Sequence, residues 1–188
     1  MTDKEENSEQ QPEKQPHSKK CSGFFKANLT LLKSYAFFVI FAVAAFSVLI
    51  TDWGQQSLLD PLNEWIAVTS AGTLQLLGTN AIANGTAVTA KQLGSVDIKE
   101  GCNGVYAIII FLAGVVAYPT GWKKKLVGIV FGSIALFIVN NIRVLTLFYL
   151  VVYKPEWFEE AHQTIWQFAI ILVGGLLWLI WYDKVVNR

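Results

Sequence analysis

The chain of 188 residues is 53% hydrophobic and only 15% charged, with a formal net charge of +1 and a mean hydropathy of +0.41. Soluble domains are usually less apolar and contain about 25% charged residues, so this composition indicates an integral membrane protein. The near-zero net charge gives no indication of a nucleic-acid partner, and two cysteines are too few for a disulfide framework.

The N-terminal segment is polar and shows no apolar periodicity. We expect a disordered cytoplasmic tail over residues 1–28 and a membrane-embedded domain over residues 29–188. The tail is too long and too acidic for the n-region of a signal peptide, so we expect the first hydrophobic segment to remain as an anchor. Cys21, in this tail, fits a small apolar filler or a lipidation site on the cytoplasmic side.

Four apolar runs predict an all-α polytopic membrane bundle of about four transmembrane helices. Their expected bounds are 33–53, 102–118, 126–153 and 163–182. Trp and Tyr stand at several of these ends, and such side chains are favoured at membrane interfaces because the ring is apolar and its polar atom stays wet.

The segment 57–78 is ambiguous because polar residues interrupt it: Asp60, Pro61, Asn63, Glu64 and Gln75. If it does not span, the cluster Lys123–Lys125 lies on the same side as the basic residues of both termini, which the positive-inside rule favours. We therefore expect an amphipathic helix on the outer face, with Trp65, Leu74 and Leu77 toward apolar surroundings.

Residues 79–101 alternate between apolar and polar side chains, with Gly94 near a turn. This pattern predicts a short β-hairpin that leads into Cys102. Together with the preceding helix it forms an outer-face insert over residues 54–101.

The four-span topology places polar residues from three helices on the outer side. Cys102 begins the second span and His162 begins the fourth. Arg143 lies within the third span, about 15 Å from its outer end, and Asn140 precedes it by three residues on the same helix face. We expect these four residues to converge.

Each of them also has a structural interpretation. A lone cysteine in a membrane protein is usually a small filler, and a histidine at a helix start is often a polar end residue. Arg143 could serve a structural ion pair. An arginine within a span nevertheless costs roughly 2.5–3.5 kcal/mol to insert, and such residues are rare and usually functional.

The residue types fit acyl transfer through a thioester. A thiolate at Cys102 would be the nucleophile, and a nearby positive charge at Arg143 would lower the thiol pKa and hold an oxyanion. His162 could exchange a proton near neutral pH. Asn103 and Gly104 would support the nucleophile, with Gly104 allowing close approach of backbone. One Cys and one His do not make a zinc site, so we expect neither metal nor other cofactor.

The residues resemble the exosortase/archaeosortase family of membrane-embedded transpeptidases. The matching pieces, in order, are CNG from Cys102, NNIR from Asn140 to Arg143, and His162 at the start of the last span. The resemblance covers residues 33–182 and is strongest to the compact exosortase H branch, although the family has Ser after the cysteine more often than Asn.

This resemblance implies an enzyme of the bacterial inner membrane that cleaves C-terminal sorting signals, made of a short motif, a transmembrane helix and a basic tail, on exported proteins. It implies that Cys102 is the nucleophile, Arg143 the thiolate and oxyanion stabiliser, His162 the general acid/base and Asn140 a supporting residue. Water or an amine acceptor would resolve the thioacyl enzyme. Both termini would be cytoplasmic and the site extracytoplasmic, with the sorting motif held within residues 57–101.

Two other classes remain open from the residues alone. One is a small transporter or assembly factor that uses Arg143 as a charge site. The other is a thiol redox protein, which is disfavoured because there is no CxxC motif and because Cys21 and Cys102 are expected on opposite sides of the membrane.

Overall fold

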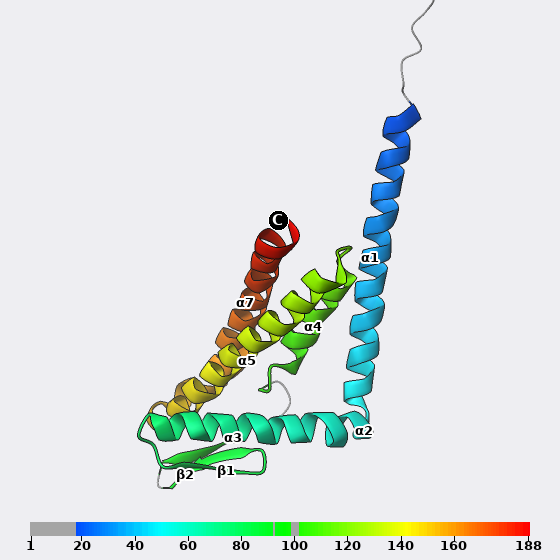
Figure 1. The fold of residues 1–188 in the computed structure, drawn as a ribbon. Helices are drawn as coiled ribbons and strands as arrows, with labels where there is room; N and C mark the ends of the chain where they lie inside the picture. Colours follow the sequence, from blue (N-terminus) through cyan, green and yellow to red (C-terminus); the bar gives the residue numbers. More distant parts are fainter. Residues whose placement is uncertain (1–17, 92, 99–101) are drawn as a thin grey trace, which may run out of the picture.

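The first helix, α1 (Ser18–Ile50), is long, apolar and straight, and it extends beyond the other helices at its N-terminal end (Figure 1). The computed structural model describes residues 18–91, 93–98 and 102–188, with side chains from residue 29 onward. The helix covers residues 18–28, which we expected to be part of a disordered tail, because no proline follows Pro16 to interrupt it. Residues 1–17 and the side chain of Cys21 lie outside the described part.

A sharp corner follows α1. Thr51 is extended, and its Oγ1 accepts a hydrogen bond from the N–H of Gly54 at 3.1 Å, which starts the short helix α2 (Asp52–Gly54). A π-helical turn, Gln55–Leu59, then leads into α3 (Asp60–Leu76), with Pro61 in its first turn. As a result, α3 runs across the end of the other helices instead of beside them (Figure 1).

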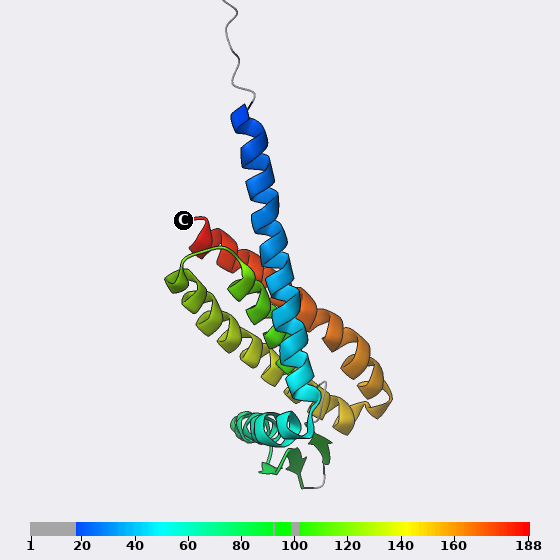
Figure 2. The same ribbon diagram turned by 90° about the vertical axis from the view of Figure 1, so that its right-hand side faces the viewer.

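The remaining long helices form a bundle. They are α4 (Val105–Ala117), α5 (Trp122–Tyr153) and α7 (Trp166–Trp181), which is preceded by the short helix α6 (Phe158–Glu160) and a π-helical turn, Ala161–Ile165. The three helices contact one another, whereas α1 packs on α4. Figure 2 shows that α5 and α7 are inclined to α1.

Three helical segments in the described part of the chain are long and apolar enough to cross a membrane: Leu29–Ile50, Trp122–Tyr153 and Pro155–Val186. These correspond to three of the four predicted spans. The fourth, predicted over residues 102–118, is the helix α4 of only 13 residues. At 1.5 Å per residue it is about 20 Å long, shorter than a hydrocarbon core of about 30 Å. It is shortened because Cys102–Gly104 form a loop and Pro119 follows the last turn.

Residues 81–97 form a three-stranded antiparallel sheet in the order β1-β2-β3, not the predicted two-stranded hairpin. The strands are β1 (Ala81–Asn84), β2 (Ala87–Ala90) and β3 (Gly94–Asp97). The predicted hairpin corresponds to β2 and β3. Strand β1 was missed, although the Asn-Gly pair before β2, with Gly85 at φ +57°, is a strong hairpin signal.

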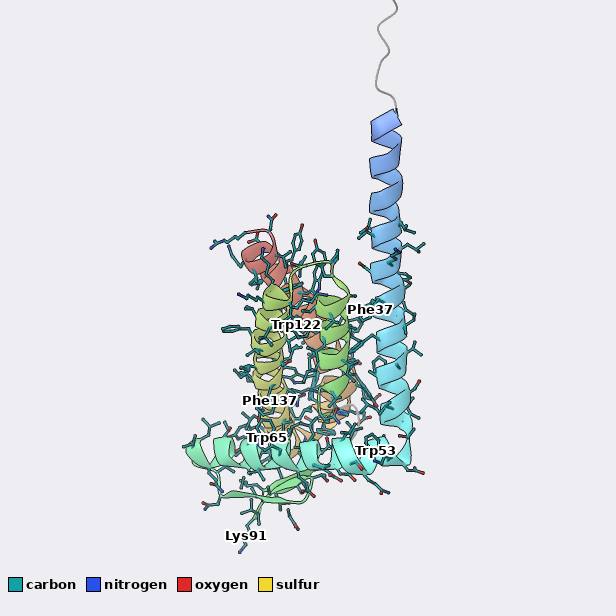
Figure 3. All side chains as sticks on the ribbon, turned by 45° about the vertical axis from the view of Figure 1, so that its right-hand side comes forward. Phe37, Trp53, Trp65, Lys91, Trp122 and Phe137 are labelled. Atoms are coloured by element: carbon teal, nitrogen blue, oxygen red, sulfur yellow. The ribbon has the colours of Figure 1, made fainter. Side chains whose placement is uncertain are left out.

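A compact core joins this sheet to α3 and α5. Leu74, Val88 and Val96 are fully or almost fully buried there with Phe148. Trp65 and Leu77, which were expected to face apolar surroundings, are more than half exposed on the protein surface. Figure 3 shows Trp65 beside Phe137, and their rings stack at a centroid distance of 4.5 Å. The amphipathic helix and the sheet thus cap one end of the bundle.

Candidate functional site

The loop Cys102–Gly104 connects the sheet to α4. The side-chain Oδ1 of Asn103 accepts a hydrogen bond from the N–H of Val105 at 3.2 Å, which forms an Asx turn directly before the helix. Gly104 has φ +68°, a left-handed conformation that residues with a side chain rarely adopt. These two residues therefore fix the turn that places Cys102 just before the helix N-terminus.

Cys102 is a free thiol and is 4% exposed. It packs against Leu147 of α5 and Ala161 of the π-helical turn. Burial raises the pKa of the Cys102 thiol above its ordinary value, and the positive charge of Arg143 partly offsets this effect. The thiol is thus mainly protonated at neutral pH, and a base is needed to produce the thiolate.

Arg143 is 2% exposed, in the middle of a long apolar helix. Its Nη2 donates a hydrogen bond to the backbone carbonyl of His162 at 3.2 Å, and its Nε has no hydrogen-bond partner in the described part of the chain. No carboxylate pairs with it among the described residues. A buried cation without a counterion is costly, which favours a functional over a structural ion-pair role.

His162 lies in the π-helical turn that interrupts the last apolar helix. Such turns are rare in proteins, and those that occur are often found at functional sites. The imidazole is half-buried and stacks on the ring of Phe158, with centroids 5.6 Å apart and planes at 9°. Its backbone contacts Arg143, but within the described residues no hydrogen bond links the imidazole to Cys102.

Asn140 is 1% exposed and lies one turn before Arg143 on α5. Its carboxamide faces the backbone of the loop Cys102–Gly104: a Cβ built on Gly104 would lie 2.7 Å from its Oδ1. In the structure, Arg143 lies near Cys102 and Asn140 lies against Gly104, whereas His162 approaches Arg143 through its main chain and not through its ring.

Asn63 contacts this loop, which was not predicted from the sequence. It is buried on α3, and its Oδ1 accepts a hydrogen bond from Nδ2 of Asn103 at 3.0 Å. Asn63 shares a buried face of α3 with residues at helical spacing: Ile66, Ala67, Ser70 and Leu74. This spacing could have revealed that Asn63 faces inward. Helix α3 is therefore connected directly to the loop Cys102–Gly104.

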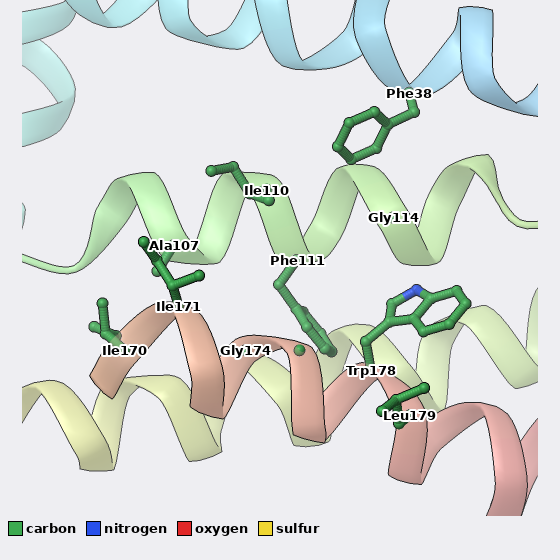
Figure 4. A pocket seen from close by; sticks show the side chains of 11 residues that line it. Phe38, Ala107, Ile110, Phe111, Gly114, Ile170, Ile171, Gly174, Trp178 and Leu179 are labelled. Carbon is green, nitrogen blue, oxygen red and sulfur yellow. The ribbon is translucent and has the colours of Figure 1, made fainter. Parts of the chain in front are cut away.

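Two apolar cavities lie away from this loop. One of about 520 Å³ is bounded by α1, α4 and α7, and Figure 4 shows Phe38, Phe111 and Trp178 around it. Its lining includes neither Cys102 nor Arg143, and every lining residue is apolar. It is not suited to acid–base chemistry. Among the described residues no three His, Cys, Asp or Glu side chains gather as metal ligands do.

Comparison with known proteins identifies the family. Residues 24–182 match the family model described as transmembrane exosortase. The chain is also 31% identical over 94 residues to a probable archaeosortase E from Methanocaldococcus jannaschii, a match that covers 50% of each chain. The chain therefore spans about half the length of that curated relative. No solved structure matches. Because the family model covers most of the chain, the protein belongs to the transmembrane exosortase family.

Proposed function

We propose that this protein is a membrane-embedded cysteine transpeptidase or protease that cleaves C-terminal sorting signals of exported proteins. The observation that supports this most is the buried pair of Cys102 and Arg143, in which the cation has no carboxylate partner among the described residues. An uncompensated guanidinium beside a thiol is suited to a negative charge that develops during reaction.

The proposed chemistry is acyl transfer. The Cys102 thiol gives up its proton, and its sulfur bonds to the scissile carbonyl carbon. Arg143 stabilises the resulting oxyanion. The C–N bond then breaks, and the leaving amine takes a proton and departs with the transmembrane helix and basic tail. Water or an amine acceptor attacks the thioester and regenerates the thiol.

We assign the proton transfers to His162. For this role the ring must turn away from Phe158 and toward Cys102. An imidazole is suited to both directions of transfer near neutral pH. The hydrogen bond between Arg143 and the carbonyl of His162 would keep the two residues in register.

The membrane orientation follows from the basic residues. In the structure, the chain runs along the bundle in alternating directions through α1, α4, α5 and α7, so the turn with Lys123–Lys125, the start of α1 and the C-terminus lie at the end opposite to α3 (Figure 1). The positive-inside rule assigns that end to the cytoplasm. In this orientation α1, α5 and α7 span the bacterial inner membrane, the shorter α4 lies among them, and Cys102 is on the extracytoplasmic side.

The outer-face insert is our candidate for binding the sorting motif. Because β2 is central, β1 and β3 are both edge strands, and a peptide can add to such an edge in extended form. The test is a disulfide crosslink in a Cys102→Ala background, between Ser95→Cys and a single cysteine in the substrate motif. We expect a crosslink there and none from Lys123→Cys at the opposite end. Equal yields would exclude this binding mode.

The function itself is tested by co-expression with an exported protein from the same genome that ends in a motif, an apolar helix and a basic tail. We expect wild type to process it and a folded Cys102→Ala variant to leave it intact, as measured by gel shift and mass spectrometry. A transporter or assembly factor that uses Arg143 as a charge site would tolerate Cys102→Ala but not Arg143→Ala. Equal processing by wild type and Cys102→Ala would refute the enzyme assignment.

A further inference from the structure

The side chain of Asn140 is buried without a partner. Among the described residues neither its Nδ2 nor its Oδ1 has a hydrogen bond, although more than nine in ten buried polar groups usually do. The adjacent Asn141 shows the usual arrangement: its Oδ1 accepts from Ser70 at 3.0 Å, and its Nδ2 donates to the carbonyl of Phe137 at 3.1 Å. An unpaired carboxamide at this depth destabilises the fold, so its presence calls for a reason.

The unpaired carboxamide is directed at the nucleophile loop. A Cβ on Gly104 would lie 2.7 Å from Oδ1 and 2.9 Å from Cγ of Asn140, so the absence of a side chain at Gly104 lets the amide lie directly against this loop. One helical turn further along α5, Nε of Arg143 is also unpartnered in the described structure. Unused polar groups from one face of α5 therefore border Cys102.

We propose that Asn140 is a catalytic residue whose carboxamide hydrogen-bonds the substrate backbone at the peptide unit next to the scissile bond. The inference rests on the proposed function and adds a substrate contact to it. A peptide unit has one N–H donor and one carbonyl acceptor, and a carboxamide offers the complementary pair. Arg143 remains the group that meets the oxyanion, while Asn140 aligns the chain for attack by Cys102. Because Asn140 would contact only main-chain atoms of the substrate, this contact is independent of the sequence of the sorting motif.

The test is Asn140→Leu, which preserves the approximate volume of the side chain and removes both polar ends. If the carboxamide serves only the substrate, the midpoint of thermal unfolding stays equal or rises, because two unpaired polar groups disappear. The kcat/KM for the co-expressed sorting-signal reporter should fall about 10²–10³-fold, as on loss of one preorganised donor. A purely structural role of Asn140 would not lower kcat/KM while leaving the unfolding midpoint unchanged.

Asn141→Leu is the matched control. It breaks the hydrogen bonds between α5 and Ser70 of α3, so we expect a lower unfolding midpoint but kcat/KM per folded molecule within about threefold of wild type. If Asn140→Leu does not insert into the membrane, Asn140→Ala replaces it under the same criterion.

The inference is overturned if the folded Asn140 variants process the reporter within about threefold of wild type, or if they lose as much stability as Asn141→Leu. Cys102→Ala, measured in parallel, separates the two proposals. If Cys102→Ala is inactive and Asn140→Leu is fully active, only the role of Asn140 fails. If Cys102→Ala is as active as wild type, or if wild type does not process the reporter, the proposed function fails and the role of Asn140 with it.

Discussion

Replacement of Gly104 by alanine should destabilise the protein by two separable effects. A non-glycine residue at φ +68° costs about 1–2 kcal/mol. The new Cβ would also lie 2.7 Å from Oδ1 and 2.9 Å from Cγ of Asn140, and both groups are enclosed, so overpacking adds about 1–3 kcal/mol. The expected total is about 2–5 kcal/mol, which for a chain of this length lowers the unfolding midpoint by about 4–20 °C.

The assay is thermal unfolding in detergent followed by the fluorescence of the seven tryptophans. Asn140→Ala removes the steric part but not the backbone part, so the double variant Gly104→Ala/Asn140→Ala should be about 1–3 kcal/mol more stable than the sum of the single effects. Gly72→Ala, where nothing lies within 4 Å of the new Cβ, is the control and should leave the midpoint unchanged or slightly higher. Strictly additive effects would refute the contact between Asn140 and the loop.

Three further predictions concern packing, positioning and the thiol. Gly132→Ala would place a Cβ against the ring of Phe111 on α4 and should lower the unfolding midpoint by several degrees. Gly174→Ala, whose new Cβ has no atom within 4 Å, should leave the midpoint unchanged. Equal midpoints for the two variants would contradict the close packing of α4 on α5. Asn63→Leu should lower kcat/KM about tenfold, because it removes the hydrogen bond that holds the loop Cys102–Gly104. Asn63→Asp should restore part of kcat/KM, because its carboxylate still accepts that bond from Asn103. Unchanged kcat/KM in both variants would refute a role of this hydrogen bond in positioning the loop. The rate of Cys102 alkylation by a small reagent should keep rising with pH beyond the range of an ordinary thiol, because burial raises the pKa of Cys102. Arg143→Gln should shift this pH–rate profile to still higher pH, because it removes the positive charge that lowers the pKa. A shift to lower pH would contradict the proposed charge effect.

The helical part of the fold was largely predictable from hydropathy. The runs that form α1, α5 and α7 are long and predominantly apolar, and within a membrane a helix is the structure that pairs all backbone polar groups of such a segment. The length of α4 was not predictable in the same way, because its ends depend on backbone conformation at Gly104 and on Pro119. Strand β1 was not predicted because its sequence, AIAN, shows no clear alternation and the strand is stabilised by burial against α3.

The residues proposed for the site were found from the sequence, whereas their contacts could not be predicted from it. Cys102, Asn140 and Arg143 were expected to meet, because topology and helical spacing place them at one end of the bundle. The stacking of His162 on Phe158 depends on the π-helical turn, which shifts the register of the last helix and has no sequence signature. The bond from Asn63 to Asn103 joins residues 40 positions apart, and no local pattern predicts such a pair.

The most direct test of the central claim is the intact mass of the enzyme during turnover. We predict that wild type incubated with the reporter gains the mass of the acyl fragment N-terminal to the cleavage site, that the adduct maps to Cys102, and that hydroxylamine releases it. Arg143→Gln should form this adduct far more slowly. Cleaved reporter with Cys102 unmodified throughout, and equal cleavage by Cys102→Ala, would contradict the account.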